Sequence, residues 1–92
     1  MSTFFHTATL PDGATFTRRN KKKPFTYFIA VKYLDAWFPG DDRVGEWQAF
    51  KWTSWFEYQV DVVLDWKEHC EKNGVRTEFE FVEPTVTVEE TR

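Results

Sequence analysis

The sequence predicts an α+β fold in which one main α-helix packs on an antiparallel sheet. Three observations predict it: the first 33 residues alternate short apolar stretches with turn residues, residues 55–73 have helical spacing, and residues 75–82 alternate again. The expected sheet is an N-terminal three-stranded meander plus a C-terminal strand. A chain of 92 residues leaves no room for a second core, so we expect one domain over residues 1–92.

The expected meander begins with strands at residues 4–10 and 14–19, joined by Pro11-Asp12-Gly13. Pro presets the first turn angle, Asp can bond its own backbone, and Gly tolerates a positive φ, so these residues predict a tight hairpin. A third strand is expected at residues 25–33. Apolar residues occupy both faces of that strand, which is typical of a central strand covered on both sides.

The expected helix runs from about residue 55 to residue 73. Ser54 and Glu57 have the spacing of a capping box, and Gly74 provides the stop. The stripe that we expect to pack on the sheet consists of Phe56, Val63, Trp66 and Cys70, with Trp55 and Val62 on its flank.

Three stretches around these elements are less regular. Within residues 34–53, Trp47 and its neighbours fit either a short strand or a helical turn. Residues 75–82 alternate apolar and charged side chains, which predicts a half-buried strand. Residues 85–92 fit either an edge strand or a frayed tail.

Charge is segregated along the chain. The net charge is −3, but residues 1–33 carry +5 and residues 34–92 carry −8. The positive half is concentrated in one run, here called the cationic segment, and its cations are Arg18, Arg19, Lys21, Lys22 and Lys23. Because consecutive cations repel one another and resist burial, we expect a projecting, solvated tip at the bend between the second and third strands.

The cationic segment is a candidate nucleic-acid or nucleoprotein binding site, since each cation that neutralises a phosphate adds salt-dependent affinity. The alternative is a solvated tip that only protects a sheet edge from aggregation. Phe25 and Tyr27 follow the segment, and their place in the strand period favours core packing over stacking on a base.

Carboxylates recur on one side of the expected helix. This acidic helix face consists of Glu57, Asp61, Asp65 and Glu68. Spacings of three and four residues gather these side chains within about one third of the helix circumference. The face is a candidate protein-binding surface, and the alternative is an ordinary solvated helix face.

Catalysis finds little support in the sequence. His69 and Cys70 are adjacent and point about 100° apart, a poor geometry for a base and a nucleophile. His6 lies on an expected strand, and no phosphate loop, zinc spacing or nucleophile elbow is present. We therefore expect no enzyme, no catalytic residues, no metal and no cofactor. A single cysteine and the lack of a long apolar run favour the cytoplasm and no membrane segment.

The opening quarter of the chain carries a resemblance. Residues 8–27 read ATLPDGATFTRRNKKKPFTY, and with the small size and the charge pattern they resemble small phage-encoded proteins, specifically type I-F anti-CRISPR proteins. The resemblance implies a protein made in the cytoplasm of the infected bacterium. It implies binding to the crRNA-guided surveillance complex, through protein subunits and possibly crRNA, and a block of target DNA binding or hybridisation.

Two other functions fit the same residues. One is a free-standing RNA- or single-strand-DNA-binding module that uses the cationic segment and nearby rings; the net charge of −3 counts against it. The other is a small protein-protein adaptor in which the cationic segment only maintains solubility. None of the three requires a small-molecule substrate.

Overall fold

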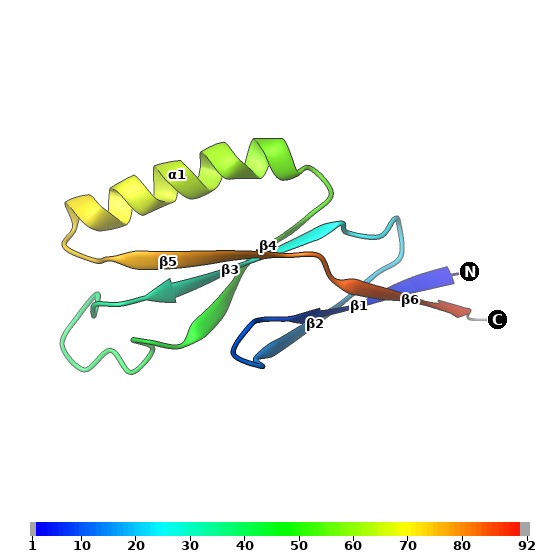
Figure 1. Ribbon diagram of the computed structural model, residues 1–92, viewed down its shortest axis with the longest axis horizontal. Helices are drawn as coiled ribbons and strands as arrows, with labels where there is room; N and C mark the ends of the chain where they lie inside the picture. The colour runs from blue at the N-terminus through cyan, green and yellow to red at the C-terminus, as the bar shows by residue number, and fades with distance from the viewer. Residues whose placement is uncertain (1, 91–92) are drawn as a thin grey trace.

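The fold is α+β, as predicted, but it has two sheets instead of one (Figure 1). The computed structural model describes residues 2–90, apart from the side chain of Phe56. Sheet A has the strand order β2-β1-β6, and sheet B has the order β4-β3-β5. Both are antiparallel throughout. The elements are β1 (Ser2–Thr9), β2 (Thr15–Asn20), β3 (Tyr27–Tyr33), β4 (Trp47–Thr53), α1 (Phe56–Lys72), β5 (Thr77–Val82) and β6 (Thr85–Glu90).

The first hairpin is confirmed. β1 and β2 pair from Phe4–Asn20 to Thr9–Thr15, and the Leu10 N–H donates to the Ala14 carbonyl at 2.8 Å. Gly13 has φ +93°, and the Asp12 carboxylate accepts the Ala14 N–H at 3.0 Å. Each turn residue therefore has the role that the sequence predicted for it.

The three-stranded meander is wrong, because β2 does not pair with β3. The chain leaves sheet A after Asn20 and enters sheet B at Tyr27. The Asn20 side chain closes a turn by accepting the Lys22 N–H at 3.3 Å and donating to the Lys23 carbonyl at 2.7 Å. A six-residue connection that contains a proline and three lysines crosses between sheets. The cationic segment is therefore not a hairpin tip.

β3 is the central strand of sheet B, as predicted. Its residues from Phe28 to Val31 are all buried. β4 lies within the stretch that the sequence left open, and its pairing with β3 shifts by one residue between Ile29 and Ala30. β5 pairs along the other side of β3.

β5 and β6 connect the two sheets. β5 ends at Val82, a link at Glu83-Pro84 follows, and β6 then pairs with β1 as an edge strand of sheet A. All six residues of β6 are exposed. The edge-strand interpretation of residues 85–92 is thus confirmed for β6, while Thr91 and Arg92 lie outside the described residues.

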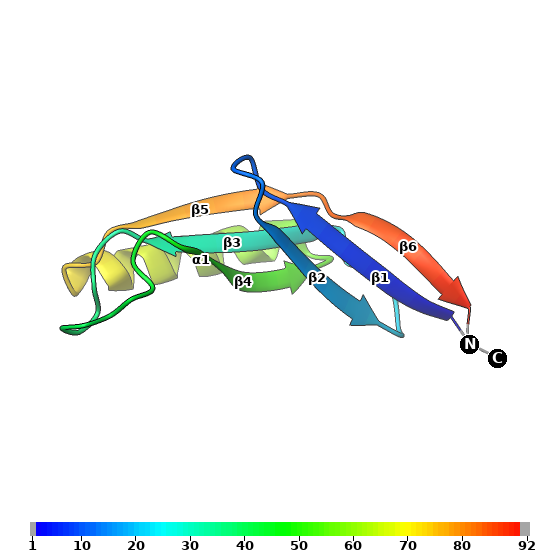
Figure 2. The same ribbon diagram turned by 90° about the horizontal axis from the view of Figure 1, so that it is seen from below.

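The core lies where the β1–β2 hairpin meets sheet B. Ala8 and Leu10 of the hairpin are buried against Phe28 and Ala30 of β3. The Phe28 ring lies 4.9 Å from that of Phe16 and 4.4 Å from that of Trp52. Because side chains alternate along a strand, Ile29 and Val31 face the other side of sheet B, which α1 covers. Figure 2 shows the helix over sheet B only, with β6 extending beyond it.

The predicted helix is confirmed, but its start differs. Trp55 is the N-cap residue, and no side chain caps the helix, so the capping box of Ser54 and Glu57 is wrong. The Thr53 hydroxyl accepts the Trp55 N–H instead, at 2.8 Å. No helix among residues 2–90 is long and apolar enough to cross a membrane.

The helix stop at Gly74 is confirmed. Gly74 has φ +76°, its N–H donates to the Glu71 carbonyl at 3.0 Å, and the Val75 N–H donates to the Cys70 carbonyl at 2.9 Å. These two bonds form a Schellman motif, which needs a residue that tolerates positive φ. The chain then turns directly into β5.

Candidate functional site

A buried histidine holds the cationic segment at both ends. The His6 ring on β1 is fully buried, its Nδ1 lies 3.0 Å from the Arg18 carbonyl, and its Nε2 lies 2.8 Å from the Phe25 nitrogen. A backbone N–H can only donate, so Nε2 accepts from Phe25, and Nδ1 carries the proton that is donated to Arg18. No sequence pattern indicates this role, because the partners are backbone groups 12 and 19 residues away.

The two arginines of the segment are exposed, and each guanidinium lies over an aromatic ring of the same molecule. Both lie on β2, with the Arg18 guanidinium 5.5 Å from the centre of the Phe25 ring and the Arg19 guanidinium 5.1 Å from that of Phe5. Arg19 also pairs with Glu89 of β6 at 3.5 Å, and both side chains are largely exposed. An exposed ion pair of this kind contributes only about 0 to 1 kcal/mol to the stability of the fold.

The three lysines of the segment differ from the arginines. Lys21, Lys22 and Lys23 are exposed, and none forms an ion pair with any residue between 2 and 90. They occupy the connection between β2 and β3, whose ends His6 fixes. Three adjacent positive charges are thus held at one place on an acidic chain without a partner in the described structure.

The rings that follow the segment contact other side chains of the chain. Phe25 lies 5.3 Å from the His6 ring and 6.4 Å from the Trp52 ring, beneath the Arg18 guanidinium. The Tyr27 hydroxyl donates to the Glu83 carboxylate at 3.3 Å. Phe25 is half-buried among these side chains and also lines a pocket of about 560 Å³, so its ring is only partly packed.

A second cationic position lies near Arg18. A pocket of about 350 Å³ is lined by Arg18 of β2 and by four consecutive residues of β4, which are Ala49, Phe50, Lys51 and Trp52. Lys51 therefore shares a pocket with a cation of the segment. The sequence missed it because β4 lay in the stretch without an assignment.

All four carboxylates of the acidic helix face are exposed. Only Glu68 has a partner among residues 2–90, Lys72 one turn later, at 3.2 Å. No cation of the segment pairs with any of the four carboxylates within the described part of the chain. The structure thus keeps the two predicted charged surfaces apart from each other.

Two aromatic side chains stand exposed at the start of α1. Trp55 is 75% exposed and Tyr58 is 62% exposed, and their rings lie 6.4 Å apart. The prediction that Trp55 flanks the buried stripe is wrong. Gln59, Val63 and Cys70 are the buried residues among the described side chains of the helix, and the expected burial of Phe56 lies outside these described side chains. The sequence places aromatic residues at positions 55, 56 and 58, and one face of a helical turn cannot bury all three. This pattern could have predicted that some of these rings are exposed.

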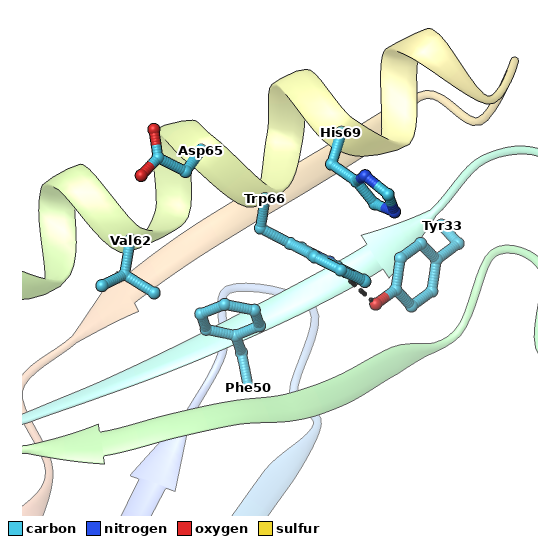
Figure 3. Close-up of a pocket in the computed structure, with 6 residues that line it drawn as sticks. All are labelled: Tyr33, Phe50, Val62, Asp65, Trp66 and His69. Carbon is cyan, nitrogen blue, oxygen red and sulfur yellow. Dashed lines mark hydrogen bonds between the residues drawn. The ribbon is translucent and has the colours of Figure 1, made fainter.

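An aromatic pocket of about 600 Å³ lies between α1 and sheet B. Its lining residues are Tyr33, Phe50, Val62, Asp65, Trp66 and His69. Figure 3 shows Val62, Trp66 and His69 reaching from the helix toward Phe50 and Tyr33, with the Asp65 carboxylate turned outward at the rim. The Trp66 Nε1–H donates to the Tyr33 hydroxyl at 3.2 Å. The sequence assigned Trp66 to core packing and so missed the pocket.

The cysteine and the second histidine of the helix have separate surroundings. Cys70 is fully buried, and burial raises the pKa of its thiol, so the thiol remains protonated at neutral pH. His69 is exposed and stacks on Trp66, with the ring centres 5.2 Å apart. Within residues 2–90, no group of three or more His, Cys, Asp or Glu side chains is arranged to hold a metal ion.

No family model, no curated protein and no solved structure matches this chain. Three surfaces of the chain are candidates for function: the three lysines without an ion pair among residues 2–90, the acidic helix face with its two exposed rings, and the aromatic pocket beside that face.

Proposed function

We propose that this protein is a stoichiometric, non-catalytic inhibitor that binds a type I-F crRNA-guided surveillance complex in the bacterial cytoplasm and blocks its binding or hybridisation of target DNA. One observation carries the proposal. Lys21, Lys22 and Lys23 are exposed without an ion pair among residues 2–90, although the chain has an excess of acids. The resemblance of residues 8–27 supplies the kind of target.

The lysines fit a phosphate backbone within that complex. Each lysine that neutralises a phosphate releases counterions and adds affinity. His6 fixes both ends of the connection, so less conformational entropy is lost when the lysines bind than with a free loop. Guide RNA and the path of the target strand offer such phosphates.

The acidic helix face fits a basic protein groove around the nucleic acid. Trp55 and Tyr58 stand beside Glu57 and Asp61 on the first turns of α1. Exposed Trp and Tyr side chains are enriched among the residues that carry most of the binding energy at interfaces, while charges around them speed association. This combination supports a protein partner for the helix.

The packing of Phe25 argues against a free-standing single-strand-binding module. Such modules stack successive bases on open aromatic rings, whereas the half-buried Phe25 ring contacts His6 and Trp52 and lies under the Arg18 guanidinium. Net charge of −3 also opposes affinity for naked nucleic acid. Nucleic-acid contact is therefore proposed within a nucleoprotein complex.

Co-elution tests the proposal directly. The purified protein is mixed with the type I-F surveillance complex, separated by size-exclusion chromatography, and assayed for target DNA binding at equimolar dose. We expect co-elution and loss of DNA binding. Changing Lys21, Lys22 and Lys23 to Glu should weaken binding by roughly 100-fold, if each lost contact costs about 1 kcal/mol. Trp55→Ala should weaken it by about 30-fold, the effect of a residue worth about 2 kcal/mol.

A charge-retaining variant provides the matched control. Arg at positions 21, 22 and 23 keeps all three positive charges and should retain most of the affinity. Failure of the wild-type protein to co-elute, with DNA binding intact at equimolar dose, refutes the proposal. Salt-sensitive binding to naked oligonucleotides without binding to the complex supports the nucleic-acid module instead.

A further inference from the structure

The aromatic pocket has a rigid wall. Trp66 is fixed by its hydrogen bond to the Tyr33 hydroxyl at 3.2 Å. Its ring centre also lies 6.1 Å from that of Trp37 and 5.2 Å from that of His69, and these two rings lie 6.4 Å from each other, so the three rings form one cluster. A ring packed in such a cluster needs little reordering when a ligand covers it. The wall is therefore preorganised for binding.

The other side of the pocket is apolar. Val62 reaches down from α1, and Phe50 reaches up from β4 (Figure 3). The Phe50 ring meets Phe79 of β5 edge to face, with centres 5.5 Å apart and an angle of 88°. A volume of about 600 Å³ is within the range of side-chain and small-ligand sites.

Charge at the rim selects among occupants. Asp65 belongs to the pocket lining, with its carboxylate turned outward, and it has no ion pair with any residue from 2 to 90. Asp61 precedes it by one turn, and it too has no such pair, whereas Glu68 is neutralised by Lys72. A cation in the pocket would be attracted to these unpaired charges, whereas a neutral ligand would not. The rim therefore favours a cation.

We propose that the aromatic pocket binds an arginine side chain of the partner protein. The aliphatic stem of the arginine packs between Val62 and Phe50, and its guanidinium plane lies on Trp66. The exposed Asp65 side chain turns toward the pocket and accepts the guanidinium N–H groups. Arginine fits better than lysine because its planar, weakly hydrated group stacks on aromatic faces and forms two parallel bonds to a carboxylate. This inference rests on the proposed function for the identity of the partner, a basic protein surface.

A peptide titration tests the pocket without the surveillance complex. The full chain, labelled with ¹⁵N, is titrated with a blocked Gly-Gly-Arg-Gly-Gly peptide, and the indole N–H signal of Trp66 is followed after assignment with Trp66→Phe. A peptide with citrulline in place of arginine keeps the shape and loses the charge. We expect the arginine peptide to shift the Trp66 signal in a saturable manner and the citrulline peptide to bind at least about tenfold more weakly.

Three variants sharpen the result. Asp65→Asn removes the rim charge and should weaken the arginine peptide by about tenfold. Glu71→Gln, an exposed position of the same helix outside both the acidic helix face and the pocket lining, is the matched control and should change the affinity less than twofold. Val62→Phe should narrow the space between α1 and Phe50 and weaken the shift, while the thermal midpoint by circular dichroism stays near that of the wild type.

Several outcomes overturn the inference: no saturable shift at Trp66 with millimolar peptide, equal affinity for arginine and citrulline peptides, or equal effects of Asp65→Asn and Glu71→Gln. An apolar occupant would appear as preference for a norleucine peptide over arginine. The titration and the co-elution assay separate the two proposals. If the arginine peptide binds but the protein does not co-elute with the complex, the pocket's role is supported and the proposed function is refuted. If the protein co-elutes and Asp65→Asn does not weaken that binding, the proposed function is supported and this role of the pocket is refuted.

Discussion

The two sheets each have three antiparallel strands around a central strand, yet their burial differs. In sheet B, β3 is covered by the first hairpin on one face and by α1 on the other, and four consecutive residues are buried. In sheet A, β1 has only three buried residues, Thr3, His6 and Ala8, and β6 is exposed along its whole length. Sheet B therefore provides most of the core, and sheet A depends on its contacts with sheet B.

The difference in burial between the two sheets shows what determines the position of the cationic segment. The segment leaves sheet A and enters sheet B, so its geometry depends on how the two sheets are joined. The joint consists of apolar packing around Phe28 and of the polar contacts of His6. Substitutions that remove the apolar packing and the His6 contacts one at a time test this difference between the two sheets.

The largest effect is expected from Phe28→Ala, at the centre of the joint. Phe28 is fully buried between Phe16 and Trp52, so its removal leaves a cavity in both sheets. We expect the free energy of unfolding to fall by about 3 to 5 kcal/mol. Urea denaturation measures it. Val88→Ala in β6 is the control, and its cost should stay below about 1 kcal/mol because Val88 is 52% exposed. Equal costs at the two sites would contradict the contrast between the sheets.

His6→Ala should follow in size. The substitution leaves the Phe25 N–H and the Arg18 carbonyl without their partner, and each unpaired buried group costs about 1 to 3 kcal/mol. We expect a loss of about 2 to 4 kcal/mol and faster hydrogen exchange at the Phe25 amide. His69→Ala, at an exposed position, serves as the matched control and should leave that amide unchanged. Unchanged exchange at Phe25 in His6→Ala would show that His6 does not fix the segment.

Gly74→Ala tests the sheet B side of the comparison. Gly74 has φ +76°, a conformation that costs a residue with a Cβ about 1 to 2 kcal/mol. Nothing lies within 4 Å of the position a Cβ would occupy, so the cost comes from the backbone alone. We expect a loss of about 1 kcal/mol by urea denaturation, with the Phe25 amide unaffected. A loss that also speeds exchange at Phe25 would show that the two sheets unfold as one unit.

The smallest effect is expected from two ion pairs at the end of sheet B. Hydrogen bonds from Arg76 lower the pKa of Asp35 to about 2, and those from Arg43 do the same for Asp41. The usual aspartate pKa is about 3.9. A lowered pKa in the folded state adds stability above pH 4, and this contribution is lost as the pH falls from about 4 to 2.

Urea denaturation between pH 7 and pH 2 measures this contribution. The stability difference between the wild type and the Asp35→Asn, Asp41→Asn double variant should shrink over that interval. Solvent screens the Arg76–Asp35 pair, in which the arginine is 72% exposed, whereas the Asp41 side chain is only 1% exposed beneath Arg43. Asp41 should therefore supply the larger part of a small difference. A difference that grows toward low pH would contradict the assigned direction.

Local sequence patterns determined the elements whose signals lie within a few neighbouring residues. Pro11-Asp12-Gly13 fixed the hairpin, Gly74 fixed the end of α1, and the apolar run at β3 fixed a strand buried on both faces. The exposure of the lysines and of the helix carboxylates also followed from charge alone, since uncompensated charges resist burial.

The way in which these strands and the helix pack together depends on contacts between residues that are far apart in the sequence. β3 pairs with β4 and β5 instead of β2, because pairing partners are chosen by packing against distant segments and not by order in the chain. His6 finds backbone groups 12 and 19 residues away, and the aromatic pocket joins residues of β3, β4 and α1. No periodic pattern of neighbouring residues predicts contacts between segments this far apart in the sequence. The sequence thus set the charges and the elements, and long-range packing set where the charges stand.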